Sequence, residues 1–242
     1  MLLKPALAAF LFYTLAGPLK AQENAVAIDS FSQETEADGL PKGWKPLTFK
    51  KIKNHTRYSV ENEGGNYYVK AVSSASASAI LKEIHPNLKT HPVLNWRWKI
   101  ESALNSADAR KKEGDDYAAR VYVAFKYDPK KASFWQKQKY GLAKKLYGKY
   151  PPHAAINYIW DNRLPVGAAL DNAYTGQTKM MVLESGDEKA GRWLEERRNI
   201  YEDYKSLFGA EPPEVDFVAI MTDTDNTREN ATAYFDDLRF LP

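Results

Sequence analysis

The sequence predicts a mainly β protein folded as an antiparallel β-sandwich or barrel. Short segments that suit strands recur along the chain, without the helices that would alternate with parallel strands. Turn-forming residues at 63–66, 85–87 and 172–176 separate several of these segments. The ten expected strands span residues 47–52, 57–60, 67–72, 78–84, 93–101, 117–127, 155–160, 179–184, 215–222 and 231–240.

Two helices are expected as insertions in this sandwich. Residues 134–150 carry an apolar stripe with helical spacing, and lysines without acidic residues surround it. Such a helix could bind an anionic membrane or an acidic partner, or only pack on its own domain. The second helix spans about residues 191–208, where a second stripe ends at Gly209.

The first residues have the features of a secretory signal. Lys4 precedes an apolar run over residues 6–17, and Ala21 offers a cleavage point. The run is shorter than the roughly 20 residues that span a bilayer. We therefore expect a signal peptide over residues 1–21 and a single β-sandwich domain over residues 22–242. We expect a periplasmic or secreted protein with no integral membrane segment in the mature chain.

Composition excludes several function classes. The 34 basic and 31 acidic residues nearly balance, which gives no indication of a nucleic-acid partner. The absence of cysteine excludes disulfides and thiol chemistry. No pair of the four histidines has the spacing of zinc ligands. Aromatic residues make up 13% of the chain, which leaves some for stacking against a ligand.

The last expected strand contains an acidic residue in an apolar setting. Alternation places Tyr234, Asp236, Leu238 and Phe240 on one face. A buried carboxylate without a partner is too costly to keep. A metal, a basic side chain or several hydrogen-bond donors must therefore meet Asp236.

Two strands with clear alternation carry basic residues on their polar faces. If the strands at 93–101 and 117–127 are neighbours, their polar faces form one basic patch. Arginine forks recognise carboxylates, so the patch predicts an acidic sugar or another anion. A solvated strand face would look the same in the sequence. The predicted ligand-binding residues are Arg97, Lys99, Arg120, Tyr122, Asn157 and Trp160.

Four carboxylates are candidates for acid–base catalysis. Asp115 and Asp116 could bind metal, or act as a pair with Glu184 or Asp223. A turn that uses the two aspartates as caps explains them equally. The segment from Asp223 to Asn226 has part of the ligand spacing of a calcium loop, without the glycine and terminal glutamate of an EF-hand.

Several segments together resemble the family called domain of unknown function 3047, which occurs in secreted bacterial proteins. The resemblance covers nearly the whole mature chain. It implies export and a single domain, and the family brings no established activity. The segments that carry it are residues 94–99, 114–120, 157–160, 198–204 and 221–227.

A looser resemblance is to calcium-containing jelly-roll carbohydrate-binding modules. It rests on residues 28–31, 40–44 and 234–238, although Ser32 stands where these modules usually have glutamate. The resemblance implies a jelly-roll, galactose-binding-like sandwich. It also implies that Asp29 and Asp236 hold a structural calcium ion.

These observations favour an exported protein that binds a polysaccharide or oligosaccharide, with an acidic glycan as the ligand that the arginines suggest. One alternative is a carbohydrate-active hydrolase or lyase that uses the carboxylates and Arg120. Another is a cell-envelope scaffold that binds protein through the lysine-rich helix. The sequence leaves open whether the protein is an enzyme.

Overall fold

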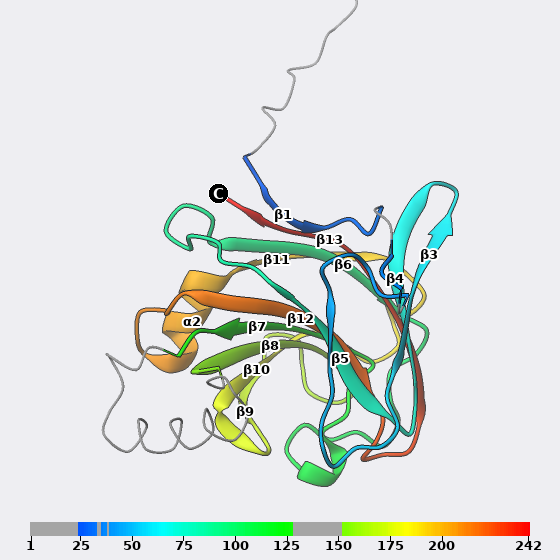
Figure 1. Cartoon of the computed structure of the whole chain (residues 1–242). Coiled ribbons are helices and arrows are strands. Elements are labelled where there is room, and N and C mark those ends of the chain that lie inside the picture. The colour runs from blue at the N-terminus through cyan, green and yellow to red at the C-terminus, as the bar shows by residue number, and fades with distance from the viewer. Residues whose placement is uncertain (1–23, 33–34, 38, 128–151) are drawn as a thin grey trace, which may run out of the picture.

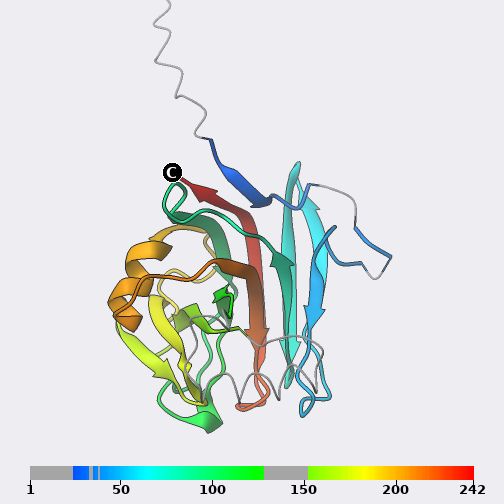
Figure 2. The same cartoon turned by 60° about the vertical axis from the view of Figure 1, so that its left-hand side comes forward.

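Two β-sheets lie face to face as the layers of a sandwich (Figures 1 and 2). The structure is a computed structural model and describes residues 24–32, 35–37, 39–127 and 152–242. The six-stranded sheet has the order β11-β6-β13-β4-β3, with β1 paired to β13, and the seven-stranded sheet has the order β2-β5-β12-β7-β8-β10-β9. The expected mainly β sandwich is confirmed.

The strand bounds agree with the sequence prediction in the middle of the chain, while β1, β9 and β11 were not expected. The strand predicted at residues 47–52 is wrong, because the strand there, β2, ends at Leu47. In the six-stranded sheet the strands are β1 (Val26–Asp29), β3 (Arg57–Glu63), β4 (Asn66–Ser74), β6 (Val93–Ile100), β11 (Leu194–Asn199) and β13 (Asn230–Leu241). In the seven-stranded sheet they are β2 (Lys45–Leu47), β5 (Ala77–Glu83), β7 (Ala119–Phe125), β8 (Ala154–Asp161), β9 (Ala169–Asn172), β10 (Thr175–Ser185) and β12 (Val215–Asp223).

Large aromatic side chains fill the space between the sheets. Trp96 and Trp98 point inward from β6 and meet β8, with ring centroids 5.4 Å apart for Trp96 and Tyr158 and 5.8 Å apart for Trp98 and Trp160. All four are almost fully buried. Burying such side chains is the main driving force for closing the two layers. Trp160, predicted to contact a ligand, is therefore a core residue.

One strand pair departs from the antiparallel prediction. β8 and β10 run parallel, because the chain leaves β8, returns as the edge strand β9 and then inserts β10 between the two. The sequence prediction missed β9, so it had no reason to expect this insertion. The sandwich is otherwise built from antiparallel pairs among the described strands.

The prediction of a helix at residues 191–208 is confirmed only for its second half. Helix α2 (Ile200–Phe208) begins after Asn199, whose side chain accepts a hydrogen bond from the backbone N–H of Glu202 at 3.0 Å. It ends at Gly209, which has the expected left-handed conformation with φ of 66°. The preceding residues form β11 instead, because they pair with the open edge of β6. Tertiary pairing here overrides the helical spacing of the side chains.

Only one of the two predicted helical insertions is thus described, in shortened form. The lysine-rich segment predicted as a helix at 134–150 lies outside the described residues. Among the residues that the structure describes, no helix has the length and apolar character needed to cross a membrane.

The prediction for the face of Asp236 was wrong for part of the last strand. The pairing of β13 with β6 shifts between Asp236 and Arg239, and Asp237 has a positive φ of 53°. This bulge adds one residue to the strand, so the alternation of side chains changes at that point. Leu238 and Phe240 therefore belong to the core, while Asp236 shares the outer face of the six-stranded sheet with Arg97.

Candidate functional site

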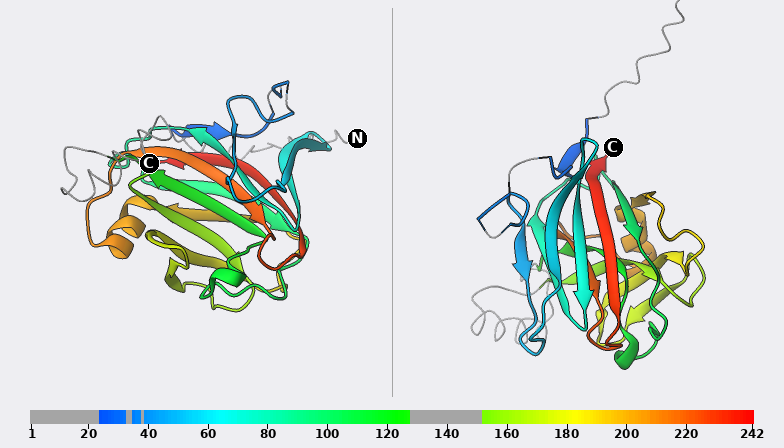
Figure 3. Two further views of the ribbon diagram at one scale, coloured as in Figure 1. Left: turned by 60° about the horizontal axis from the view of Figure 1, so that its bottom comes forward. Right: turned by 90° about the vertical axis from the view of Figure 1, so that its right-hand side faces the viewer.

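Side chains of chemical interest gather at one end of the sandwich, which we call the loop end. Here β6, β8, β10 and β12 finish, and the connections 101–118, 162–168, 186–193 and 224–229 lie. Figure 3 (left) shows the short 3-10 helix η1 (Lys112–Gly114) near the loop that joins β12 to β13. Segments far apart in the sequence thus supply one site.

Arg120 is the centre of this arrangement and is only 2% exposed. Its Nε donates to Asp223 Oδ1 at 2.8 Å, and its Nη2 donates to the other oxygen of the same carboxylate. Nη2 also donates to the backbone carbonyl of Asp115 at 2.5 Å, and Nη1 donates to the Tyr122 hydroxyl at 2.9 Å. All three nitrogens are used within the protein. The guanidinium therefore serves to hold carboxylates in place rather than to capture an external anion.

Four carboxylates surround or adjoin this guanidinium. This carboxylate cluster consists of Asp115, Asp116, Asp223 and Asp225. Single ligand oxygens of Asp116, Asp223 and Asp225 all lie within 4.8 Å of one another. Oxygen ligands at such spacing suit a divalent cation such as calcium. Within the described part of the chain, this is the group of acidic residues that could hold a metal.

A glycine sets the position of the first two aspartates. A Cβ atom on Gly114 would lie 2.6 Å from the backbone nitrogen of Asp108, which is closer than real Cβ atoms come to backbone. That close approach allows the backbone N–H of Asp108 to donate to the Gly114 carbonyl at 2.9 Å. The tight turn then delivers Asp115 and Asp116 to the start of β7. Any side chain at position 114 would push the turn away.

Hydrogen bonds fix Asp116 to the neighbouring loop. Its Oδ1 accepts from the side-chain amide of Asn226 at 3.0 Å, and its Oδ2 accepts from the backbone N–H of Thr227 at 2.6 Å. The loops before β7 and after β12 are therefore joined through one carboxylate. This contact brings Asp225 close to Asp116.

The charges in the carboxylate cluster do not balance, because one guanidinium faces four carboxylates. Burial, with Asp116 and Asp115, raises the pKa of Asp223 well above its usual range, although Arg120 opposes the shift. Burial and Asp116 likewise raise the pKa of Asp225. Burial raises the pKa of Tyr122 to about 12, so its hydroxyl stays neutral. The site therefore suits neutral or cationic groups, and it accepts hydrogen bonds from hydroxyls.

An exposed aromatic ring stands beside the carboxylate cluster. Tyr174, in the turn between β9 and β10, is 57% exposed. Its hydroxyl lies 2.9 Å from the carbonyl of Lys112 and 3.2 Å from Oδ1 of Asn226. Asn172 accepts from the Tyr174 backbone N–H at 3.0 Å and donates to Asp115 Oδ2 at 2.9 Å. These contacts fix the ring at the edge of the cluster while leaving much of it in solvent.

The structure separates the residues predicted to form one basic patch. β6 and β7 belong to different sheets, so Arg97 and Lys99 lie on the outer face of the six-stranded sheet and Arg120 does not. Arg97 pairs with Asp236 and donates to Asn66 Oδ1 at 2.9 Å. The Lys99 ammonium lies 4.2 Å from the ring centroid of Tyr234. The prediction that Arg97 and Arg120 share a ligand is wrong.

Other predicted site residues are only partly brought together. Asn157 lies directly opposite Tyr122 on the neighbouring strand. Its amide is fully buried and finds no hydrogen-bond partner among the described residues. Glu184 pairs with Lys189 at 2.8 Å, apart from the carboxylate cluster. Asp115, Asp116 and Asp223 do converge, as the catalytic hypothesis requires.

The two predicted calcium ligands are each engaged in an ion pair. Asp29 Oδ2 lies 2.7 Å from the Lys82 ammonium and accepts from the Trp44 indole at 2.8 Å. Asp236 pairs with Arg97 and accepts from the backbone N–H of Asp237 at 2.7 Å. Calcium at these two residues stays a prediction. A metal there would have to displace a cationic side chain from each carboxylate.

Tyr174 and Asn172 were missed as site residues, because residues 172–176 were interpreted only as a turn. The available signal was an aromatic side chain within a turn of otherwise small and polar residues. Turns usually place such a ring in solvent, where it can contact a ligand.

Comparison with known proteins adds a family. Residues 42–239 match the family described as "Protein of unknown function (DUF3047)". This chain belongs to the DUF3047 family. No curated protein matches the sequence.

Several solved structures of low sequence identity are similar to the DUF3047 chain. A family 12 xyloglucanase from Bacillus licheniformis has 8% identity and a TM-score of 0.47, with 91% of this chain and 100% of that chain covered. The carbohydrate recognition domain of Emp47p has 10% identity and a TM-score of 0.45, with coverage of 91% and 96%. A carbohydrate-binding module specific for non-crystalline cellulose, CBM28, has 10% identity and a TM-score of 0.39, with coverage of 86% and 96%. These similarities are too distant to transfer a function.

Proposed function

We propose that this protein binds a neutral glycan at the loop end of the sandwich. The observation that carries the proposal is the Tyr174 ring, which is exposed and yet fixed beside carboxylates and amides. A tyrosine held in this way offers a large amphipathic surface at a low cost in conformational entropy. The apolar face of a sugar ring can stack on it while the sugar hydroxyls reach polar groups nearby.

The polar groups beside Tyr174 suit hydroxyls. Asp225, Asn226 and Asn172 are partly exposed and lie at the edge of the carboxylate cluster. Carboxylates and amides accept or donate hydrogen bonds, and a few such groups beside an aromatic ring are typical of small-ligand sites. The excess of negative charge disfavours an acidic glycan. We therefore propose a neutral glycan in place of the acidic one that the sequence suggested.

Removal of the ring tests this function directly. Tyr174→Ala should weaken binding of a glycan identified on an array at least about tenfold, which corresponds to roughly 1.4 kcal/mol. Binding weakens because the stacking surface is lost, and titration calorimetry measures the affinity of each variant for the glycan. Tyr67→Ala is the matched control, because Tyr67 is another exposed tyrosine, in the β3–β4 hairpin.

Two outcomes would contradict the proposal. One is equal glycan binding by the Tyr174→Ala variant and the natural protein. The other is affinity that falls steeply with salt, since that dependence indicates an anionic ligand.

A second candidate function is glycan hydrolysis by the carboxylate cluster. Asp116 and Asp225 lie close together, and the pKa of Asp225 is raised by burial and by Asp116. A protonated carboxyl beside an ionised one is the arrangement used for general acid–base catalysis. Asp225→Asn should then abolish turnover of oligosaccharides but keep their binding. If no released sugar is detected with the natural protein, this candidate is rejected and the binding function remains.

Export to the periplasm or the medium remains our proposal for localisation. It rests on Lys4, the apolar run at 6–17 and Ala21, which lie outside the described residues. The intact mass of protein from the periplasmic fraction should show the loss of about 21 residues. A full-length product in the membrane fraction would contradict it. The finer assignment to jelly-roll, galactose-binding-like sandwiches is likewise a proposal, supported by the two-sheet architecture.

A further inference from the structure

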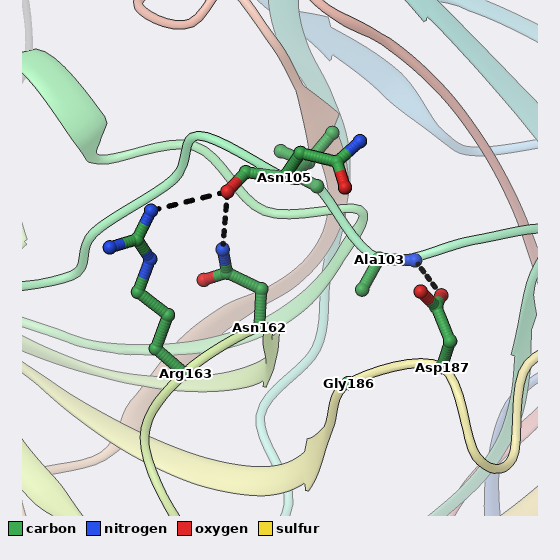
Figure 4. A pocket seen from close by; sticks show the side chains of 7 residues that line it. Ala103, Asn105, Asn162, Arg163, Gly186 and Asp187 are labelled. Atoms are coloured by element: carbon green, nitrogen blue, oxygen red, sulfur yellow. Dashed lines mark hydrogen bonds between the residues drawn. The ribbon is translucent and has the colours of Figure 1, made fainter.

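A cavity of about 280 Å³ opens at the loop end, between three connections. We call it the end cavity. Its position follows from the fold, because the connections after β6, β8 and β10 meet where these strands finish. The lining residues are Ala103, Leu104, Asn105, Asn162, Arg163, Gly186 and Asp187. Figure 4 shows Arg163 and Asn162 on one side of the cavity and Asp187 on the other.

Hydrogen bonds between the connections make the wall of the end cavity rigid. The carbonyl of Asn105 accepts from Arg163 at 3.2 Å and from the Asn162 side chain at 3.4 Å (Figure 4). Asp187 Oδ1 accepts from the backbone N–H of Ala103 at 2.6 Å. The three connections are therefore tied to one another around the space. A preformed wall of this kind reduces the entropy that a ligand loses on binding.

The strand ends beneath the cavity are fixed as well. Asp161 Oδ1 accepts from the backbone N–H groups of Arg163 and Leu164, both at 2.6 Å. The Trp160 indole donates to the carbonyl of Gly186 at 2.9 Å, and Gly186 donates to the carbonyl of Asp161 at 2.9 Å. The core tryptophan thus supports the floor of the site. This role differs from the ligand contact that the sequence suggested for it.

Two charged side chains on opposite walls keep hydrogen-bonding capacity for a ligand. Among the described residues, the Arg163 guanidinium has one hydrogen bond, to Asn105, so its remaining N–H groups are free to donate. Asp187 has one side-chain oxygen in use, and the other can accept. A guanidinium fork and a carboxylate each match a pair of adjacent hydroxyls. Because the two charges are opposite, the cavity has no preference for a charged ligand.

We propose that the end cavity is a subsite for one terminal sugar residue of the glycan. This inference rests on the proposed function and adds how the chain is held. Pockets for drug-sized ligands occupy about 300–1,000 Å³. A cavity of about 280 Å³ therefore suits one sugar ring rather than several consecutive residues. We assign the cavity to a terminal residue of the glycan, because only one ring has to be accommodated there.

Free monosaccharides are the probes for this subsite. We would titrate D-glucose, D-galactose, D-mannose and N-acetyl-D-glucosamine into labelled full-length mature protein and follow the side-chain NMR signals of Arg163 and Asn162. At least one sugar should shift these signals in a saturable manner at millimolar concentration, which is usual for a small ligand with few contacts. Arg163→Gln and Asp187→Asn should each weaken this binding at least about tenfold.

The variants are chosen so that folding stays intact. Asparagine at position 187 keeps an oxygen to accept from Ala103, and Arg163 is a surface residue. Arg110→Gln is the matched control, because Arg110 is an exposed arginine in the connection after β6 and does not itself line the end cavity. It should bind the same sugar as tightly as the natural protein.

The results separate this inference from the proposed function. If none of the four sugars moves the Arg163 signals, or the two cavity variants bind the sugar unchanged, the subsite assignment is overturned. Glycan binding that still depends on Tyr174 would then leave the proposed function standing. Conversely, saturable sugar binding at Arg163 supports the subsite even if Tyr174→Ala has no effect, in which case the proposed role of Tyr174 fails.

Discussion

Replacing Arg120 with methionine should destabilise the protein by about 3–5 kcal/mol, the usual cost of breaking a buried ion pair from one side. The substitution keeps most of the volume but removes the donors that meet Asp223, Asp115 and Tyr122. The two carboxylates then stay buried without a cation. Urea unfolding followed by tryptophan fluorescence measures the change.

The pH dependence distinguishes this mechanism from a packing defect. Burial already raises the pKa of Asp223, and loss of Arg120 removes an opposing influence. A carboxyl with a raised folded-state pKa favours folding below its unfolded pKa, near 3.9, and that contribution disappears as the pH rises through the folded value. The decrease in the free energy of unfolding that Arg120→Met causes should therefore become smaller as the pH falls from 7 to 4. A loss that is constant over this range would indicate packing instead.

A matched control and a second-site variant complete the test. Arg110→Met breaks an ion pair with Asp108, but Arg110 is 62% exposed, so the expected loss is below about 1 kcal/mol. Adding Asp223→Asn to Arg120→Met removes one uncompensated charge and should recover part of the stability. If the stability lost in the double variant equals the sum of the losses in the two single variants, Arg120 and Asp223 do not stabilise the protein as a pair.

The sequence was most informative where strands alternate cleanly and lie in the middle of a sheet. Alternation predicted the inward faces of β6 and β7, and their predicted side chains do lie in the core: Leu94, Trp96, Trp98, Ile100, Ala119, Val121, Val123 and Phe125. Tyr117, predicted on the same face just before β7, packs instead in a separate cluster with Met180. Such strands bury one whole face, so alternation alone decides which side chains point inward. Their membership in two different sheets could not be predicted in the same way. Alternation gives the inner face of a strand but says nothing about its neighbours.

Local irregularities account for the errors within single elements. At Asp237 one bulged residue reverses the alternation, and no local pattern in the sequence marks the position. At 194–199 the spacing fits a helix, but the open edge of β6 offers a row of backbone groups that another strand must meet. Both outcomes depend on a partner distant in sequence.

The sequence predicted several residues of the candidate site, but it did not predict how they are arranged in space. Asp115, Asp116 and Asp223 were singled out because acidic residues cluster at strand ends, and the structure brings them together around Arg120. The enzyme alternative combined these carboxylates with Arg120, but the ion pair of Arg120 with Asp223 was not predicted, because it joins the start of β7 to the end of β12. Tyr174 and the end cavity depend on contacts among several connections. Such contacts leave no periodic signal in a single sequence.

Asp236→Ala should lower the stability by on the order of 3 kcal/mol, the next largest effect that we expect. Asp236 is 2% exposed and pairs with Arg97 on the outer face of the six-stranded sheet. Its other oxygen accepts from the backbone N–H of Asp237 at 2.7 Å, which holds the bulge. Alanine would leave the guanidinium and the bulge without their acceptor. Since about 1 kcal/mol shifts the melting temperature of a chain of this size by roughly 2–4 °C, calorimetry should show a decrease of about 6–12 °C.

Asp237→Asn is the control for this effect, because it changes the adjacent residue and keeps the backbone conformation. Asp237 is 36% exposed and also contacts Arg97, at 2.8 Å. Asparagine tolerates the positive φ of 53° at this position, so only a partly exposed ion pair is lost. The melting temperature should fall by no more than about 2–4 °C. Equal effects at 236 and 237 would show that the burial of Asp236 does not determine its contribution.

A double variant, Asp236→Leu with Arg97→Met, should recover stability lost by Asp236→Ala, because it replaces the ion pair with apolar groups of similar volume.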